Sequence, residues 1–147
     1  MKTINILILI ALAVSTTSAF ARIGETRQEI DKRYGDGKRS DTQRLEGAET
    51  IKYHFNNFEV EVVFHDNKST KEIFHGTLVT SDIKSILKAN AGEQAWHYDG
   101  MNHRWERSGD PKYIGYFLPG HEDYFCIEDV KAIEVIQNSD ANDLKGF

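Results

Sequence analysis

The chain has 147 residues, with 18 basic and 23 acidic side chains and a formal net charge of −5. This length suits one domain, and the acidic balance argues against nucleic acid or an anionic membrane as a partner, because both select a basic face. A single cysteine, Cys126, excludes a disulfide within the chain, so stability must come from the hydrophobic core.

Residues 1–21 are typical of a secretory signal peptide. Lys2 supplies a positive start, residues 6–14 are apolar without interruption, and Ala19-Phe20-Ala21 has the small–x–small cleavage pattern. An uncleaved membrane anchor is the alternative, but this apolar run is well short of the roughly 20 residues that a spanning helix needs. We therefore expect cleavage after Ala21, a periplasmic or secreted location, and no membrane insertion of the mature chain.

The mature chain is expected to open with a short helix. Thr26 and Glu29 have the spacing of a capping box, and Gly35 is placed to end the helix. Ile30 and Tyr34 are four residues apart, which puts them on one buried face.

Three strands are expected after this helix. The predicted strands are residues 51–55, 58–65 and 70–76, joined by turns at Asn56-Asn57 and at 66–68. The middle strand alternates apolar and polar residues, which is typical of an antiparallel sheet with one buried and one wet face. Glu59 and Glu61 lie on the wet face. His54 and His65 beside them are interpreted as part of a solvated surface in preference to a metal site, and His75 can face either side.

The second half, residues 78–137, repeats this order. Thr80 or Ser81 is expected to cap a helix with an apolar stripe at Ile83, Ile86 and Leu87, ending at residues 90–92. Five strands should follow, at residues 95–99, 103–107, 112–118, 123–128 and 132–137. Residues 138–147 form a polar C-terminal tail.

Two successive helix-plus-meander units predict a single α+β domain over residues 22–137. We expect an antiparallel β-meander sheet with two short helices on one face, built from a duplicated α-β-β-β unit with halves at about 22–77 and 78–137. An offset of 53 places Ile30 on Ile83, but few further residues match. The repeat is therefore expected in the architecture more than in the sequence.

The stretch RIGETRQEIDKRYGDG, residues 22–37, resembles the helix opening of SmpA/OmlA-like domains of the bacterial outer-membrane assembly machinery. The two-repeat layout also resembles the β-lactamase-inhibitor-protein-like fold, and the second half is similar to small uncharacterised secreted bacterial proteins. These resemblances imply binding of other proteins without catalysis. The chain departs from the lipid-anchored members, which carry a cysteine just after the leader, and its second helix lacks the Gly-x-Thr start. No binding residue is carried over.

The segment EQAWHYDGMNHRWER, residues 93–107, holds both tryptophans and the strongest candidates for a site. An even hairpin loop puts Trp96, Tyr98, His103 and Trp105 on one face, because side chains alternate along a strand. An odd loop instead groups His97, Asp99, His103 and Trp105, which would suit a metal. We favour the even loop, since it separates aromatic from charged side chains.

The functional expectation is an exported module that binds a protein or other ligand, with an envelope or extracellular protein as the partner. The candidate partner-binding residues are Tyr98, Met101 and His103. No catalytic, cofactor-binding or metal-binding residue is assigned, because no nucleophile, metal-ligand or phosphate-loop motif is present. The alternative is a small secreted enzyme or metal carrier that uses the histidines of the 97–103 hairpin.

Two further residue types are interpreted as structural. Cys126 is expected to be a buried apolar residue of a strand, with a reactive thiol or an intermolecular bridge as the alternative. His121 is expected in a polar loop.

Overall fold

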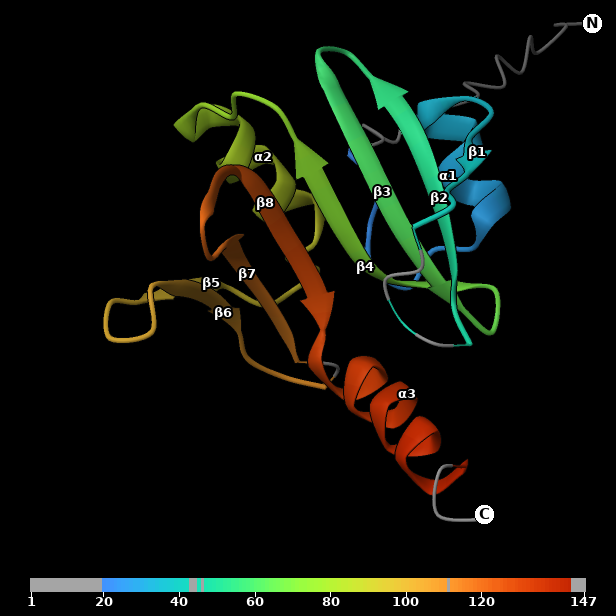
Figure 1. Ribbon diagram of the computed structural model, residues 1–147. Coiled ribbons are helices and arrows are strands. Elements are labelled where there is room, and N and C mark those ends of the chain that lie inside the picture. The colour runs from blue at the N-terminus through green and yellow to red at the C-terminus, as the bar shows by residue number, and fades with distance from the viewer. Residues whose placement is uncertain (1–19, 43–44, 46, 111, 144–147) are drawn as a thin grey trace, which may run out of the picture.

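The computed structural model describes residues 20–42, 45, 47–110 and 112–143 (Figure 1). It confirms an α+β fold with one antiparallel sheet, which has eight strands, and it contains three helices. The elements in chain order are α1 (Arg27–Tyr34), β1 (Lys38–Arg39), β2 (Glu49–Phe55), β3 (Phe58–His65), β4 (Lys68–His75), α2 (Thr80–Ala89), β5 (Trp96–Asp99), β6 (Arg104–Arg107), β7 (Tyr113–Leu118), β8 (His121–Asp129) and α3 (Val130–Asp143).

The sheet consists of two meanders that meet through their last strands. The strand order is β1-β2-β3-β4-β8-β7-β6-β5, so the junction is the pair β4 and β8. Phe74 lies opposite Phe125 at this junction. The two-residue strand β1 was not predicted, and it extends the sheet beyond β2.

The first helix is stabilised by the capping box that its sequence predicts. The Thr26 hydroxyl accepts a hydrogen bond from the Glu29 amide at 3.3 Å, and the Glu29 carboxylate accepts one from the Thr26 amide at 2.8 Å. Gly35 follows the last turn with φ of 84°, a conformation that side chains disfavour. Ile30 and Tyr34 are buried, as expected.

The second helix begins in a different way from the prediction. Val79 is the residue before the first turn, and no side chain caps the helix from that position, so the expected cap at Thr80 or Ser81 is wrong. The Asp82 carboxylate instead accepts a hydrogen bond from the Val79 amide at 2.9 Å. The helix ends at Asn90, as predicted.

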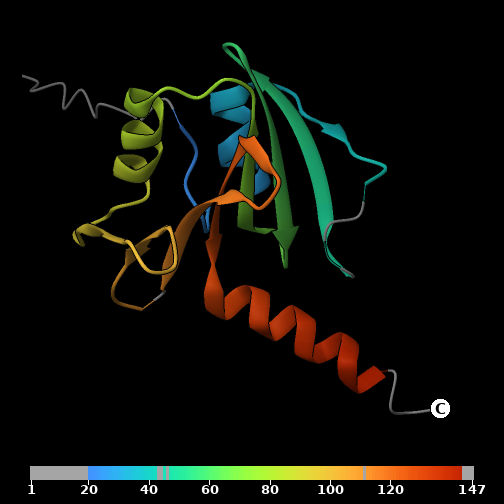
Figure 2. The ribbon, with the colours of Figure 1, turned by 60° about the vertical axis from the view of Figure 1, so that its left-hand side comes forward.

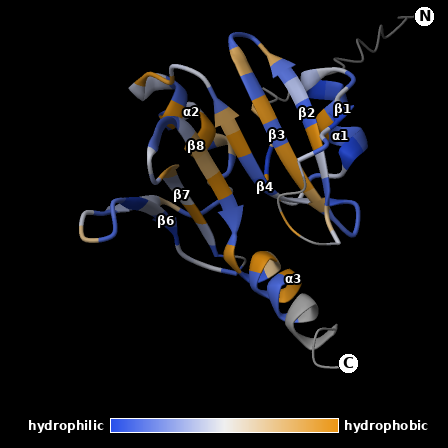
Figure 3. Ribbon diagram, viewed as in Figure 1, coloured by the Kyte–Doolittle hydropathy of each residue, from blue (hydrophilic) through white to orange (hydrophobic). Residues whose placement is uncertain are grey.

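In strands β2 to β4 the predicted core face is buried, and Figure 3 shows hydrophobic and hydrophilic residues interleaved along the sheet. The opposite face, which was expected to be wet, is not exposed throughout, because Glu61, Val63 and Ile73 on it are also buried. The β3–β4 turn has two residues, Asp66 and Asn67, both with positive φ. A bulge near Val63 then shifts the register by one residue. As a result, His75 lies opposite Glu59 on the face away from the core.

One hydrophobic core unites the two meanders and the first two helices. Its fully buried aromatic side chains are Tyr53, Phe74 and Phe125. Cys126 in β8 is also completely buried, which confirms its interpretation as a buried strand residue.

Helix α3 corrects the prediction for residues 132–137, which were expected to form a strand. Asp129 accepts a hydrogen bond from the Ala132 amide at 3.1 Å, so it caps this helix. Ile133 and Ile136 are buried at helical spacing, whereas Val135 is exposed. The helix extends away from the sheet (Figure 2) and runs through the predicted tail boundary at 137/138. Within the described part of the chain, no helix has the length and apolar character to cross a bilayer.

Candidate functional site

The β5–β6 hairpin has an even loop, and its aromatic side chains share one face. Residues 100–103 form the loop, and Tyr98 lies directly opposite Trp105. Trp96 shares this face because it is two residues from Tyr98, while His97 faces the other side. The predicted even number of loop residues is therefore confirmed, although the loop begins one residue later than expected.

The hairpin does not gather the ligand set of the metal-binding alternative. His97 Nε2 lies 3.8 Å from Glu106 Oε2 on one face. His103 Nδ1 lies 3.3 Å from the Tyr98 hydroxyl on the other face. His103 is thus separated from His97 and Asp99, and the three side chains do not converge.

The base of the hairpin is anchored to the core. The Trp105 ring centre lies 5.7 Å from that of Phe125 and 6.3 Å from that of Phe117. Trp96 donates a hydrogen bond from Nε1 to the Leu87 carbonyl at 2.6 Å, which ties β5 to α2. Both tryptophans are half-buried, so they cover the edge of the core and do not fill its centre.

The tip of the hairpin, residues 98–103, has exposed side chains on a turn that is held by hydrogen bonds. The Met101 side chain is 89% exposed and Tyr98 is 53% exposed. The Asp99 carboxylate accepts hydrogen bonds from the Met101 amide at 3.0 Å, the Asn102 amide at 3.3 Å and the Asn102 side chain at 2.6 Å. These bonds, led by the side-chain bond from Asn102, lower the pKa of Asp99. The predicted partner-binding residues therefore lie together on a turn that hydrogen bonds hold in place. They are Tyr98, Met101 and His103.

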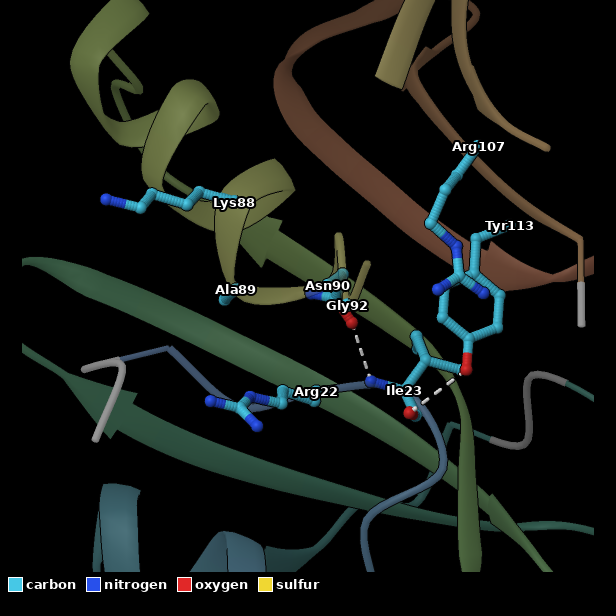
Figure 4. Close-up of a pocket in the computed structure, with 8 residues that line it drawn as sticks. All are labelled: Arg22, Ile23, Lys88, Ala89, Asn90, Gly92, Arg107 and Tyr113. Carbon is cyan, nitrogen blue, oxygen red and sulfur yellow. Dashed lines mark hydrogen bonds between the residues drawn. The ribbon is translucent and has the colours of Figure 1, made fainter. Parts of the chain in front are cut away.

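A pocket of about 350 Å³ lies where the N-terminal segment meets the end of α2 and strand β7 (Figure 4). Asn90 Oδ1 accepts a hydrogen bond from the Ile23 amide at 2.7 Å, and the Tyr113 hydroxyl donates to the Ile23 carbonyl at 3.3 Å. These contacts hold the segment against the domain and account for the buried position of Asn90.

The charged side chains around this pocket are basic, but their charged ends do not point toward one another. The Arg107 guanidinium lies 3.7 Å from the centre of the Tyr113 ring. Arg22 and Lys88 also line the pocket, but Figure 4 shows their charged ends pointing away from Arg107. The pocket therefore lacks the convergent donors that an anionic ligand would need.

A cluster of charged side chains lies on the outer face of the sheet, away from the core. One ligand atom from each of Glu59, Glu61 and His75 lies within 4.8 Å of the others. Lys52 Nζ lies 3.1 Å from Glu61 Oε1 and 3.5 Å from Glu59 Oε1. The hydrogen bond to Glu61 raises the pKa of Lys52. We call these four residues the outer-face cluster.

Two of the four residues in this cluster were expected together from the sequence. Glu59 and Glu61 were placed on the polar face, and His54 and His65 were weighed as their partners. The structure brings His75 to them instead: its Nε2 lies 3.8 Å from Glu61 Oε2, whereas His65 pairs with Asp66. The alternation of residues along β3 predicts the face of Glu59 and Glu61. The face on which His75 lies depends on the β3–β4 turn and on the bulge, so it could not be read from the alternation.

The outer-face cluster borders an open hollow of about 560 Å³, which His54 also lines. The His75 ring centre lies 4.2 Å from that of Tyr124, and His121 stacks on the same tyrosine at 5.0 Å. His121 begins strand β8, which corrects its predicted loop position. His75 and Tyr124 line the hollow.

Comparison with known proteins gives no match: no protein-family model, no curated protein and no solved structure is significantly similar to this chain. Its function is therefore inferred from the residues and their geometry.

Proposed function

We propose that the protein is an exported binding module that recognises another protein of the cell envelope or the extracellular medium and performs no catalysis. The observation that carries this proposal is the tip of the β5–β6 hairpin, where an almost fully exposed methionine sits on an ordered turn. Figure 1 shows this turn projecting from the rest of the domain.

The chemistry of the tip suits a protein partner. Tyrosine and methionine are enriched at protein interfaces, and methionine adapts its shape to the surface it meets. Because Asp99 already pins the turn, binding would cost little further backbone entropy. Among the described residues, the exposed large apolar side chains are Val79, Tyr98, Met101 and Val135, and two of these four lie at the tip.

The arrangement of elements supports a duplicated unit with two helices on one face, although each unit would have four strands and not the three of the expected α-β-β-β unit. Helix α1 precedes the meander β1–β4, and α2 precedes the meander β5–β8. Ile30 of α1 and Ile86 of α2 belong to the same core. This layout also supports the resemblance to SmpA/OmlA-like and β-lactamase-inhibitor-protein-like domains, which act through protein binding.

Replacing Met101 with Asp is expected to lower partner recovery at least about tenfold, because one central interface residue often contributes 2 kcal/mol or more. The measurement is affinity capture from an envelope extract with the immobilised mature protein, followed by mass spectrometry. The fold should not change, since the side chain is exposed.

Val135→Asp is the matched control, because Val135 is also an exposed apolar residue but lies on α3. It should leave both the captured protein and its amount unchanged. Equal capture by wild type and Met101→Asp would show that the tip is not the docking element.

We also propose export after removal of the leader. The Phe20 ring centre lies 5.6 Å from that of Phe55 and 5.9 Å from that of Phe74, and the Ala21 amide donates to the Tyr34 hydroxyl at 2.8 Å. Cleavage after Ala21 would remove Phe20 from this core. Its packing supports cleavage two residues earlier, after Thr17-Ser18-Ala19, which is also a small–x–small sequence.

Mass spectrometry of the exported protein is therefore expected to give Phe20 as its first residue. A chain that begins at Arg22 would contradict the earlier cut while preserving export. An exported chain with Met1 intact would contradict removal of the leader.

A further inference from the structure

We propose that Glu59, Glu61 and His75 form a binding site for a divalent first-row transition-metal ion, with Zn²⁺ as the best-suited ion. The ligand atoms of the three side chains already lie within 4.8 Å of one another. Zinc accepts histidine nitrogen and carboxylate oxygen at about 2.0–2.2 Å, so small side-chain rotations bring all three onto one ion. This site is separate from the hairpin tip and does not depend on the proposed binding function.

The backbone positions the three ligands before any ion arrives. Glu59 and Glu61 are two residues apart on β3, so they project from the same face. His75 lies directly opposite Glu59 on β4. Side chains that face each other across an antiparallel pair have Cβ atoms about 4.5–5.5 Å apart, which one ion can bridge.

The burial of this cluster favours a bound cation. The Glu61 side chain is only 1% exposed and that of His75 is 12% exposed. A carboxylate at this depth is costly unless a positive charge lies beside it. In the structure Lys52 supplies that charge, with its ammonium 3.1 Å from Glu61.

Lys52 is suited to leave when a metal binds. Its side chain is 37% exposed, and lysine carries its charge on a flexible stem. An ion of charge +2 between the two glutamates would repel the ammonium, which can swing out to solvent. The open hollow beside Glu59 and His75 leaves room for water at the remaining coordination position.

The ligand types select the class of ion. Magnesium and calcium prefer oxygen ligands alone, whereas an imidazole nitrogen favours zinc and its first-row neighbours. Zinc should therefore bind and magnesium should not. His97 offers a matched control, because its Nε2 also lies 3.8 Å from a glutamate oxygen, that of Glu106.

The experiment is a titration of the untagged mature protein with Zn²⁺, followed by calorimetry and by the melting temperature. Zinc is expected to raise the melting temperature of the wild type. His75→Ala and Glu59→Ala should each lower zinc affinity at least about 100-fold, since the loss of even an outer-shell partner costs 10- to 100-fold. His97→Ala should bind zinc as the wild type does.

Lys52→Met separates a metal site from a purely structural ion pair. Without metal this variant should melt at a lower temperature, because Glu61 loses its cation. With zinc it should recover, and its zinc affinity should rise about three- to tenfold because the competing ammonium is absent.

The proposal is overturned if zinc leaves the wild-type melting temperature unchanged, or if Mg²⁺ produces an equal shift. It is equally overturned if His75→Ala and Glu59→Ala retain the zinc response, or if His97→Ala loses it. Because the Glu59 side chain is 36% exposed, Glu59→Ala keeps the test available even if His75→Ala does not fold.

Discussion

Replacing Phe125 with Ala is expected to lower the free energy of unfolding by about 3–5 kcal/mol. Phe125 is completely buried and lies opposite Phe74 at the β4–β8 junction, where the two meanders meet. Its ring centre lies 5.4 Å from that of Phe117 and 5.7 Å from that of Trp105. The substitution would leave a cavity in the core below the sheet, beside Phe117 and Trp105, and the close-packed surroundings can fill it only in part.

Urea unfolding followed by circular dichroism measures this loss. Trp105→Ala is the comparison, and it should cost less because Trp105 is only half-buried. A loss below about 1 kcal/mol for Phe125→Ala would contradict a packed junction between the meanders.

Replacing Glu72 with Gln is expected to stabilise the protein at alkaline pH. Glu72 is completely buried, and within the described part of the chain neither of its carboxyl oxygens has a hydrogen-bond partner. Burial, with a smaller contribution from the charge of Glu25, raises the pKa of Glu72 from 4.5 to about 8, and the charge of Arg33 opposes both effects. At neutral pH the carboxyl group is therefore mainly protonated.

The sign of the pH dependence follows from this raised pKa. Between about pH 4.5 and pH 8 the folded state binds more protons at Glu72 than the unfolded chain, so stability falls as pH rises through this window. One pKa unit corresponds to about 1.36 kcal/mol, so the full loss is roughly 4–5 kcal/mol above pH 8. Glutamine has a similar shape but does not ionise, so Glu72→Gln removes this loss.

The measurement is the free energy of unfolding of wild type and Glu72→Gln at pH 5 and pH 9. The two should agree within about 1 kcal/mol at pH 5, and the variant should be more stable at pH 9 by roughly 4–5 kcal/mol. Glu93→Gln, which changes an exposed carboxylate, is the control. A difference that stays constant with pH would contradict a buried, protonated Glu72.

Features that depend on neighbouring residues could be predicted. The capping box of α1 needs only Thr26 and Glu29, three residues apart, and both of its hydrogen bonds are present. The shared face of Trp96 and Trp105 follows from an even loop, because side chains alternate along each strand. In both cases the contacts that decide the structure lie within about ten residues.

Only part of the outer-face cluster could be predicted from the sequence, because its residues come from different strands. Glu59 and Glu61 share a face through the alternation of one strand, but His75 reaches them from the next strand. A two-residue turn alone would pair Glu59 with Phe74. The bulge near Val63 adds one residue on the β4 side, which returns Phe74 to the core and brings His75 to the glutamates.

The sequence by itself determined the α+β class, the first helix, the hairpin faces and the burial of Cys126, because hydrophobic period and local hydrogen bonding decide these features. Only the tertiary structure decided that β4 pairs with β8 and that residues 132–137 are helical. Both sides of β8 are already paired, with β4 and β7, so the chain that follows has no free strand beside it. The residues after Asp129 therefore form a helix, which satisfies its backbone hydrogen bonds internally and buries Ile133 and Ile136.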